Sequence, residues 1–191
     1  MVTGDEYLVV GPANTQHPTP YTLVTAEADS RLLIADGWSE AEMRAVIQRV
    51  RRAQVIIDGG AVGQIGPGLV VFLGVGKEDG QEEVDWMVEK IAHLRIFEDS
   101  EGRMDRSVLE TGGEALVISQ FTLYGDARKG RRPDFTAAAG SVEAEPLYHR
   151  FVQSLGARGV PVQSGVFGAR MLVQLDNDGP VTLLLEREAK G

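Results

Sequence analysis

Hydroxyl, amide and aromatic side chains gather in the stretch SQFTLYG, residues 119–125, which interrupts an apolar run. Thr122 carries a hydroxyl, which becomes a nucleophile when a neighbouring base removes its proton. The competing interpretation is an amphipathic strand whose hydroxyls make ordinary hydrogen bonds. The residue types alone leave both interpretations open.

A second candidate is the stretch ARKGRRPDF, residues 127–135, in which basic side chains surround a glycine in a predicted loop. Such a run is usually only solvated, but it also suits the binding of phosphate groups. The formal net charge of −9 does not exclude an RNA partner, because a nearly balanced domain binds RNA where its arginines cluster. The acidity is concentrated in residues 1–42, where one basic and seven acidic side chains give −6. The basic residues of the loop are Arg128, Lys129, Arg131 and Arg132.

The stretch NDGPVT, residues 177–182, lies between two apolar runs. Asn-Asp-Gly is an ordinary signal for a hairpin turn. Pro180 follows Gly179 where the second strand should begin to donate hydrogen bonds, and a proline has no N–H to donate. The simple interpretation is a stop to the strand. Because an X-Pro bond costs little in its cis form, the sequence does not decide the isomer.

The usual catalytic and metal-binding motifs are missing from the sequence. The chain has no cysteine, and its three histidines, His17, His93 and His149, are far apart. No HExxH or GxSxG motif occurs, and GVGKED, residues 74–79, lacks the first glycine and the Ser or Thr of a phosphate-binding loop. We therefore expect no bound metal, no cofactor and no disulfide. An enzyme with this sequence would work without an obvious side-chain triad.

These stretches must be positioned by a domain of mixed α and β structure that starts at Met43. Short runs rich in apolar and β-branched residues predict about nine strands. Two helices against this many strands indicate an α/β or α+β domain with a largely antiparallel sheet. The predicted strands are Ala45–Val50, Gln54–Ile57, Ala61–Ile65, Leu69–Val75, His93–Phe97, Ala115–Leu123, Val162–Phe167, Met171–Leu175 and Val181–Leu185.

Two helices are expected from apolar residues at helical spacing. The first follows Asp79, which with Glu82 three residues later resembles a capping box, and its apolar face spans residues 84–91. The second is predicted to start near Glu145, with Pro146 in its first turn. Both helices would pack on the sheet and bury their apolar faces against it.

Residues 1–42 differ from the rest and are interpreted as a poorly ordered acidic extension, with residues 43–191 as the functional domain. Within the extension, Tyr7–Val10 or Leu32–Ile34 could form a short strand. No run reaches the roughly 18 apolar residues of a membrane span. The N-terminus also lacks a basic segment followed by an apolar one, as a secretory signal would have. We therefore expect a cytoplasmic protein with no membrane partner.

Several of these stretches occur together in one order and spacing. They are MRAVIQRV, FLGV, RIFEDSEGRM, SQFTLYGDARKGRRPDF, LYHRFV, SGVFGARMLVQL and NDGPVT. In this combination the chain resembles the D-aminoacyl-tRNA deacylases, the D-tyrosyl-tRNA(Tyr) deacylase family, from Met43 to Glu186. The resemblance implies a homodimeric cytoplasmic hydrolase without a cofactor, which removes D-amino acids from mischarged tRNA and also acts on glycyl-tRNA(Ala). It also implies a sheet curled into a barrel-like core with two main helices packed on it.

The resemblance assigns Gly179 and Pro180 to chiral selection. In the family this Gly-Pro bond is cis and projects from one subunit into the active site of the other. The backbone carbonyls of Gly179 and Pro180 would then face the α-amino group of the substrate. With the ammonium and the ester fixed, an L side chain would meet this rigid backbone, whereas a D side chain would point outward. Arg49 corresponds to a family position that steadies this Gly-Pro segment.

The resemblance places catalysis at Ser119, Gln120, Phe121 and Thr122, which would line the pocket. Backbone N–H groups near Phe121 and Thr122 would stabilise the oxyanion, and Phe121 would pack near the terminal adenine. The 2′-OH of the substrate would assist an attacking water in place of a side-chain base. A nucleophilic Thr122 ranks second, because no base is visible beside it in the sequence. The four basic residues of the loop would hold phosphates of the acceptor stem of tRNA.

Three rival interpretations remain open at the level of sequence. A related editing deacylase with a trans Gly-Pro bond would cleave L-alanyl-tRNA. A non-catalytic module of the same fold would bind tRNA without ester turnover, and a metal-dependent hydrolase would lose activity on chelation. The sequence also departs from the family pattern in its 42-residue extension and in Pro146 at the start of the second helix.

Overall fold

The computed structural model describes residues 43–128 and 130–187, and the expectations for residues 1–42 lie outside this part. Strands and helices follow one another in a mixed order along the described chain. No helix in this part is long and apolar enough to cross a membrane. The elements are β1 (Arg44–Ile57), β2 (Gly60–Ile65), β3 (Gly68–Gly74), α1 (Gln81–Ala92), β4 (Phe97–Glu98), β5 (Met104–Arg106), α2 (Val108–Thr111), β6 (Glu114–Ser119), the 3-10 turn η1 (Phe121–Tyr124), α3 (Ser141–Ala157), β7 (Val162–Ser164) and β8 (Leu172–Glu186).

A six-stranded sheet forms the centre of the fold, and β1 pairs with three of its other strands. β1 pairs antiparallel with β2, β3 and β8, and the sheet continues from β3 through parallel pairs to β6 and β7. β2 comes back toward β7, since a side chain at Gly63 would lie 3.0 Å from the Ser164 carbonyl oxygen. The sheet is therefore mixed and nearly closed into a barrel. The fold class expected from the sequence is confirmed.

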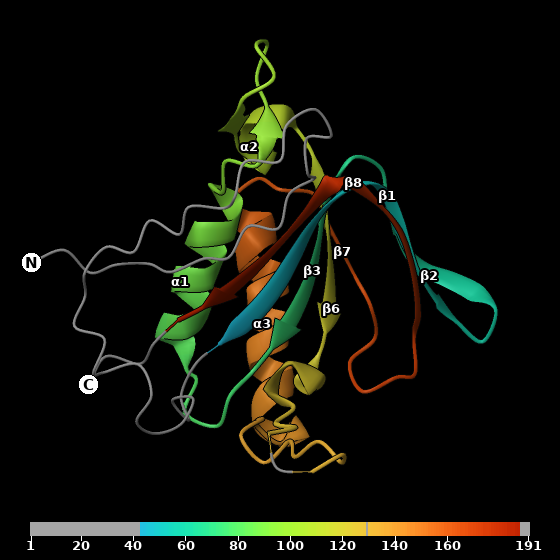
Figure 1. The fold of residues 1–191 in the computed structure, drawn as a ribbon, viewed down its shortest axis with the longest axis vertical. Coiled ribbons are helices and arrows are strands. Elements are labelled where there is room, and N and C mark those ends of the chain that lie inside the picture. Colours follow the sequence, from blue (N-terminus) through green and yellow to red (C-terminus); the bar gives the residue numbers. More distant parts are fainter. Residues whose placement is uncertain (1–42, 129, 188–191) are drawn as a thin grey trace, which may run out of the picture.

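Helices α1 and α3 lie side by side against one face of the sheet (Figure 1). α1 contributes the fully buried Val84, Met87 and Ile91, and α3 contributes Phe151 and Leu155. Each such side chain stabilises the fold by about 1.5–3 kcal/mol through its burial, so this layer supplies most of the hydrophobic core. A second buried cluster consists of Val50, Ala53, Val55, Ile65, Val70, Leu116 and Ile118.

The first predicted helix begins one residue later than its sequence signal indicates. Its N-cap is Gly80 rather than Asp79, and its capping box is closed by Glu83 rather than Glu82. The Glu83 carboxylate accepts a hydrogen bond from the Gly80 N–H at 2.9 Å. Asp79 serves the preceding loop, where it accepts from the Gly76 N–H at 2.6 Å. Two adjacent acidic residues make the spacing rule ambiguous by one position.

The second predicted helix, α3, begins at Ser141 and not near Glu145, so Pro146 lies inside it. The N–H that Pro146 lacks would bond to the carbonyl of Val142, one turn earlier. Val142 is 81% exposed, so water can satisfy that carbonyl instead. The helix therefore accommodates a proline that sequence rules place in a first turn.

Several strand boundaries differ from the sequence prediction. β1 joins the predicted strands 45–50 and 54–57, and β8 joins those at 171–175 and 181–185. The predicted strand 115–123 is wrong in its second half, where β6 gives way to η1. The predicted strand 93–97 is also wrong, because it is turn and irregular chain up to the start of β4. Long-range pairing with β1 extends strands through residues whose local pattern predicts a break.

Candidate active site

The stretch SQFTL lies where β6 ends and the 3-10 turn η1 begins. Gln120 is tied to the neighbouring strand β3, since its N–H donates to the Leu73 carbonyl at 2.7 Å. The first hydrogen bond inside η1 runs from the Leu123 N–H to the Gln120 carbonyl at 3.2 Å. The N–H groups of Phe121 and Thr122 precede that bond, as the first N–H groups of any helix do. The hydrogen bond of the turn therefore does not use the N–H groups of Phe121 and Thr122.

A cavity of about 390 Å³ opens beside this stretch. Ser119, Gln120 and Phe121 line one side, and side chains from α3 and from the loop before β8 line the others. Most of the lining is apolar, which suits a site where a small number of polar groups fixes the orientation of a ligand. Phe121 is 58% exposed, so its ring is open to a planar ligand.

Tyr148 of α3 forms a wall of the cavity but is not placed to transfer a proton. Its hydroxyl donates to the Val117 carbonyl at 2.9 Å, and its ring centroid lies 5.7 Å from that of Phe167. Burial raises the pKa of the Tyr148 hydroxyl to about 12, so it stays protonated at neutral pH. Tyr148 therefore shapes the cavity and does not act as an acid or a base there.

Thr122 is exposed next to the cavity and is not part of its wall. Its hydroxyl accepts a hydrogen bond from the side-chain amide of Gln120. An amide is not a base near neutral pH, so this contact does not activate the hydroxyl as a nucleophile. Within residues 43–128 and 130–187, no group of three or more His, Cys, Asp or Glu side chains is arranged to hold a metal ion.

The NDGPVT stretch does not reverse the chain, as its hairpin signal predicts, but loops out of β8. The pairing with β1 jumps from Val50–Asn177 to Gln48–Thr182, so one residue of β1 faces four of β8. We call residues 178–181 the Gly-Pro bulge. The Gly179–Pro180 peptide bond in it is cis, and both residues are exposed in the isolated chain. A bulge of this size aims backbone away from the sheet.

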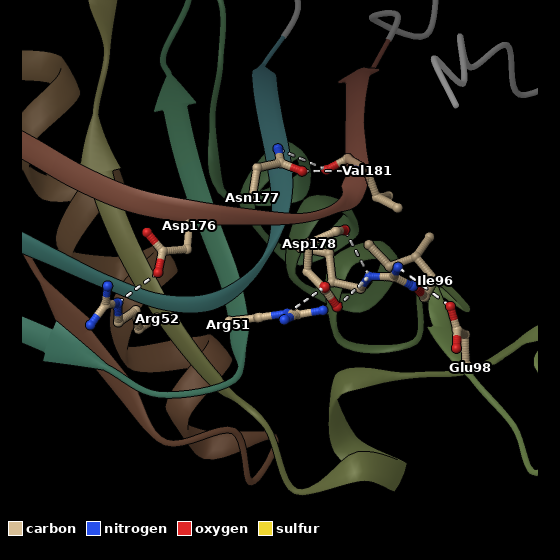
Figure 2. Close-up of polar contacts among 9 residues, drawn as sticks. Arg51, Arg52, Ile96, Glu98, Asp176, Asn177, Asp178 and Val181 are labelled. Carbon is tan, nitrogen blue, oxygen red and sulfur yellow. Dashed lines mark hydrogen bonds and ion pairs between the residues drawn. The ribbon is translucent and has the colours of Figure 1, made fainter. Parts of the chain in front are cut away.

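The side chain of Asn177 spans the base of the Gly-Pro bulge (Figure 2). It accepts from the Val181 N–H at 2.8 Å and donates to the Val181 carbonyl at 3.3 Å. Gly179 has φ +125°, and a Cβ there would lie 2.8 Å from Val181 Cγ2. Both the backbone angle and the space therefore require a glycine at this position.

Arg49 lies beneath the Gly-Pro bulge and is only 5% exposed. Its Nε donates to the Asp178 carbonyl at 3.1 Å, and its Nη1 donates to the Ile96 carbonyl at 2.6 Å. Its guanidinium also lies 3.7 Å from the Glu98 carboxylate. On the exposed side, Arg51 pairs with the Asp178 carboxylate at 2.8 Å (Figure 2). Charge-assisted hydrogen bonds therefore hold the bulge at its base.

The basic loop is closed at its base and adjoins the cavity. Asp126 and Asp134 exchange backbone hydrogen bonds of 2.7 and 2.8 Å, which bring the two ends of the loop together. Directly after this closure, the ring centroid of Phe135 lies 5.3 Å from that of Phe121, edge to face. A ligand held by the loop would therefore lie next to the cavity.

The basic side chains of this loop are not equivalent. Arg128 folds back on the Asp126 carboxylate through hydrogen bonds of 2.9 and 2.8 Å, which raise its pKa. Arg131 and Arg132 are exposed. Lys129 lies outside the described residues. The structure therefore favours Arg131 and Arg132 over Arg128 as contacts for an anion.

The predicted site residues form two groups within one chain. Ser119, Gln120 and Phe121 line the cavity, whereas Gly179 and Pro180 do not belong to its lining among the described residues. The second group is held by residues that sequence reasoning missed. Asn177 and Asp178 carry a signal, because Asn and Asp side chains often bond nearby backbone in turns. Ile96 and Glu98 carry none, because they support Arg49 only through their place in the fold.

Comparison with known proteins assigns most of the chain to one family. The family model described as D-Tyr-tRNA(Tyr) deacylase matches residues 46–186. A protein from Symbiobacterium thermophilum named D-aminoacyl-tRNA deacylase is 57% identical over 146 residues, which are 76% of this chain and 97% of that protein. A protein of the same name from Thermus aquaticus is 55% identical over 148 residues, which are 78% of this chain and 97% of that protein.

A solved structure gives the same result at the level of the fold. It is named c-Myc DNA Unwinding Element Binding Protein, is 44% identical to this chain and superposes with a TM-score of 0.73. The superposition covers 76% of this chain and 99% of that one. The range matched by the family model includes the cavity, the basic loop and the Gly-Pro bulge.

Proposed function

The chain belongs to the D-Tyr-tRNA(Tyr) deacylase family, and on this premise we propose that it hydrolyses the ester of D-aminoacyl-tRNA to free D-amino acid and tRNA. The observation that carries the proposal is the identity of more than half of the residues over nearly the full length of relatives with this name. Every residue that lines the cavity lies within the matched range. The protein is accordingly a hydrolase, and tRNA is its partner.

The reacting ester would lie in the cavity beside η1. The N–H groups of Phe121 and Thr122 would bind the oxyanion, a contribution of about 2.7–4 kcal/mol per donor in enzymes where it has been measured. The amide that contacts Thr122 is not a base, which supports water as the nucleophile and not the Thr122 hydroxyl. The 2′-OH of the terminal adenosine would assist that water, with its proximity replacing a side-chain base. The exposed ring of Phe121 would pack near the adenine.

Chirality would be read by the Gly-Pro bulge of a partner subunit. The bulge is exposed, braced at its base by Arg49 and Asn177, and outside the cavity lining of its own chain. In the two-fold dimer that we propose, each bulge would enter the cavity of the other chain. The carbonyls of Gly179 and Pro180 would hold the substrate ammonium, and the rigid backbone would exclude an L side chain. Glycine has no side chain to exclude, so glycyl-tRNA(Ala) would also be cleaved.

The phosphates of tRNA would be held by the basic loop beside the cavity. Arg131 and Arg132 are exposed there, and Lys129 belongs to the same loop. Phosphate contacts position a nucleic acid without reading its sequence, so the enzyme would accept many tRNAs. This mechanism needs no metal and no cofactor. We place the enzyme in the cytoplasm, where aminoacyl-tRNA is made and used.

The proposal is tested by incubating the full chain with matched D- and L-tyrosyl-tRNA at a fixed salt concentration, with and without a chelator. We expect release of D-tyrosine that the chelator does not change, and L-tyrosyl-tRNA that stays intact. Comparable cleavage of L-tyrosyl-tRNA or L-alanyl-tRNA would instead support the related editing deacylase. Binding of tRNA without release of either amino acid would support the non-catalytic module, and loss of activity on chelation would support a metal-dependent hydrolase.

A further inference from the structure

Arg44 of β1 and Gly74 of β3 are directly opposite each other in the sheet, and both contact η1. Neither residue belongs to the cavity lining among the described residues. We infer that this cross-strand pair is the seat that fixes the position of η1, and that Arg44 is a positioning residue for hydrolysis. The catalytic consequence of the seat rests on the proposed function, whereas its packing does not.

Arg44 holds the end of η1 through its guanidinium. The residue is buried, with 5% of its surface exposed. Its Nη1 donates to the Leu123 carbonyl at 3.1 Å, and its guanidinium carbon lies 4.7 Å from the centre of the Tyr124 ring. The Leu123 carbonyl is near the end of a four-residue turn, where helix carbonyls lack partners inside the helix. The residue three positions on, Asp126, donates its N–H to the Asp134 carbonyl at 2.7 Å. Arg44 therefore gives that carbonyl of Leu123 a hydrogen-bond donor.

The guanidinium is itself fixed from the opposite side. Its Nε lies 3.1 Å from the Glu186 carboxylate at the end of β8. Burial raises the pKa of Glu186, and the charge of Arg44 opposes this shift. A buried cation with a defined carboxylate partner has little freedom to follow a displaced turn. Arg44 can therefore act as a fixed point for η1.

Gly74 supplies the other half of the seat by having no side chain. A Cβ at Gly74 would lie 2.9 Å from Tyr124 Cε2 and 3.1 Å from the Gln120 carbonyl oxygen. Tyr124 is buried, with 3% of its surface exposed. The Gln120 oxygen is backbone and accepts the first hydrogen bond of η1, at 3.2 Å from the Leu123 nitrogen. The turn therefore rests directly on the backbone of β3.

A shift of the seat would reach the proposed oxyanion donors, because the N–H groups of Phe121 and Thr122 belong to the same turn. Misplacement of a reacting group by about 1 Å can lower a rate by about 100-fold. The basic loop has a closure of its own, because Asp126 and Asp134 exchange backbone hydrogen bonds at its base. Disturbing the seat should therefore lower kcat and leave the KM for tRNA nearly unchanged.

The test uses the full chain with Arg44→Met, which keeps a long apolar stem, Arg44→Lys, which keeps a donor, and Gly74→Ala. We expect kcat for D-tyrosyl-tRNA to fall by about 10- to 100-fold in Arg44→Met and Gly74→Ala, with KM within about twofold of the wild type. Arg44→Lys should recover part of the loss, since an ammonium can still donate to the Leu123 carbonyl. Hydrogen exchange of the backbone amides of residues 121–125 is measured in the same variants, and it should become faster there without a matching increase in α1.

Two matched controls separate the seat from general damage to the sheet. Arg52→Met removes an arginine from the same strand, where Arg52 pairs with Asp176 of β8 at 2.6 Å. Gly60→Ala adds a methyl group to β2, where the nearest atom to the new Cβ is 3.7 Å away. Both controls should keep the wild-type kcat and the wild-type exchange in η1.

A wild-type kcat in folded Arg44→Met would overturn the proposal. Unchanged hydrogen exchange of the backbone amides of η1 would overturn it as well. Equal losses in Arg44→Met and Arg52→Met would show a general effect of charge or stability and would overturn it too. If the wild type releases no amino acid, the proposed function fails, and hydrogen exchange alone then decides whether Arg44 and Gly74 hold the turn. If Gly74→Ala does not fold, Arg44→Met and Arg44→Lys decide the question.

Discussion

At the scale of single residues, the partly buried carboxyl of Asp79 makes the stability of the fold depend on pH. Burial raises the pKa of its carboxyl from 3.8 to about 6, although the Gly76 N–H bonds one of its oxygens. The folded protein therefore binds this proton more tightly than the unfolded chain does. By linkage, the resulting stabilisation is complete below about pH 3.8 and is lost as the pH rises through about 6.

Asp79→Asn cannot ionise at this position and should remove that dependence. From about pH 5 to about pH 8, the free energy of unfolding of the wild type should fall relative to the variant by about 1 kcal/mol, after a discount for partial exposure. Urea unfolding of both proteins at the two pH values measures the difference. A gap that stays constant, or that moves in favour of the wild type, would contradict the raised pKa of Asp79.

Thr122 offers a second prediction at this scale, because its hydroxyl is paired with an amide and not with a base. Thr122→Ala should retain most of the single-turnover rate on D-tyrosyl-tRNA. A substrate whose terminal nucleotide is 2′-deoxyadenosine should be hydrolysed poorly by the wild type, because it lacks the assisting hydroxyl. The opposite pattern, an inactive Thr122→Ala and a rapidly cleaved deoxy substrate, would restore Thr122 as the nucleophile.

At the scale of elements, the end of β6 shows what the sequence cannot predict. An apolar run through Leu123 favours a longer strand, because periodicity alone does not mark where pairing stops. In the structure β6 pairs with β3 up to Ser119, and β3 itself ends at Gly74. The limit is therefore set by a partner distant in sequence. The residue types of SQFTL left its role open, and only the family resemblance assigned it to a catalytic pocket; its arrangement as a turn was not predicted.

The basic loop gives the prediction at the element scale. The double variant Arg131→Ala with Arg132→Ala should weaken tRNA binding equally for different tRNAs. It should also reduce the magnitude of the slope of log K against log salt by about 1.4–1.8, since each of the two lost phosphate contacts removes about 0.7–0.9. Binding titrations between about 50 and 200 mM salt measure this slope.

Arg103→Ala is the matched control for the loop variant. Arg103 lies in the segment between β4 and β5, at the opposite end of the molecule from the basic loop (Figure 1), and it pairs with Asp99 at 2.9 Å. Its loss should leave the slope unchanged. Equal slopes for the wild type and the double variant would exclude the loop from tRNA binding.

At the scale of the whole molecule, the sequence predicts the class of the fold better than its pairing. The two long helices and most strands have a local pattern, so a mixed α and β domain follows from residues 43–187 alone, whereas the short helix α2 was not predicted. Which strands become neighbours depends on contacts between distant segments, so the parallel pairs β3–β6 and β6–β7 are not predictable. The same applies to the site, where Arg49 meets Asp178 only because β1 pairs with β8.

The central claim is that each cavity is completed by the Gly-Pro bulge of the other subunit, and mixed dimers test it most directly. One chain carries Gly179→Ala, which damages the bulge, and the other carries Phe121→Ala, which damages the cavity. We predict that both pure dimers are impaired, whereas isolated mixed dimers, with one intact cavity facing one intact bulge, regain about half of the wild-type D-tyrosyl-tRNA hydrolysis and its selectivity. Mixed dimers no more active than the pure variants would contradict the claim, because a bulge that serves its own cavity leaves neither site complete.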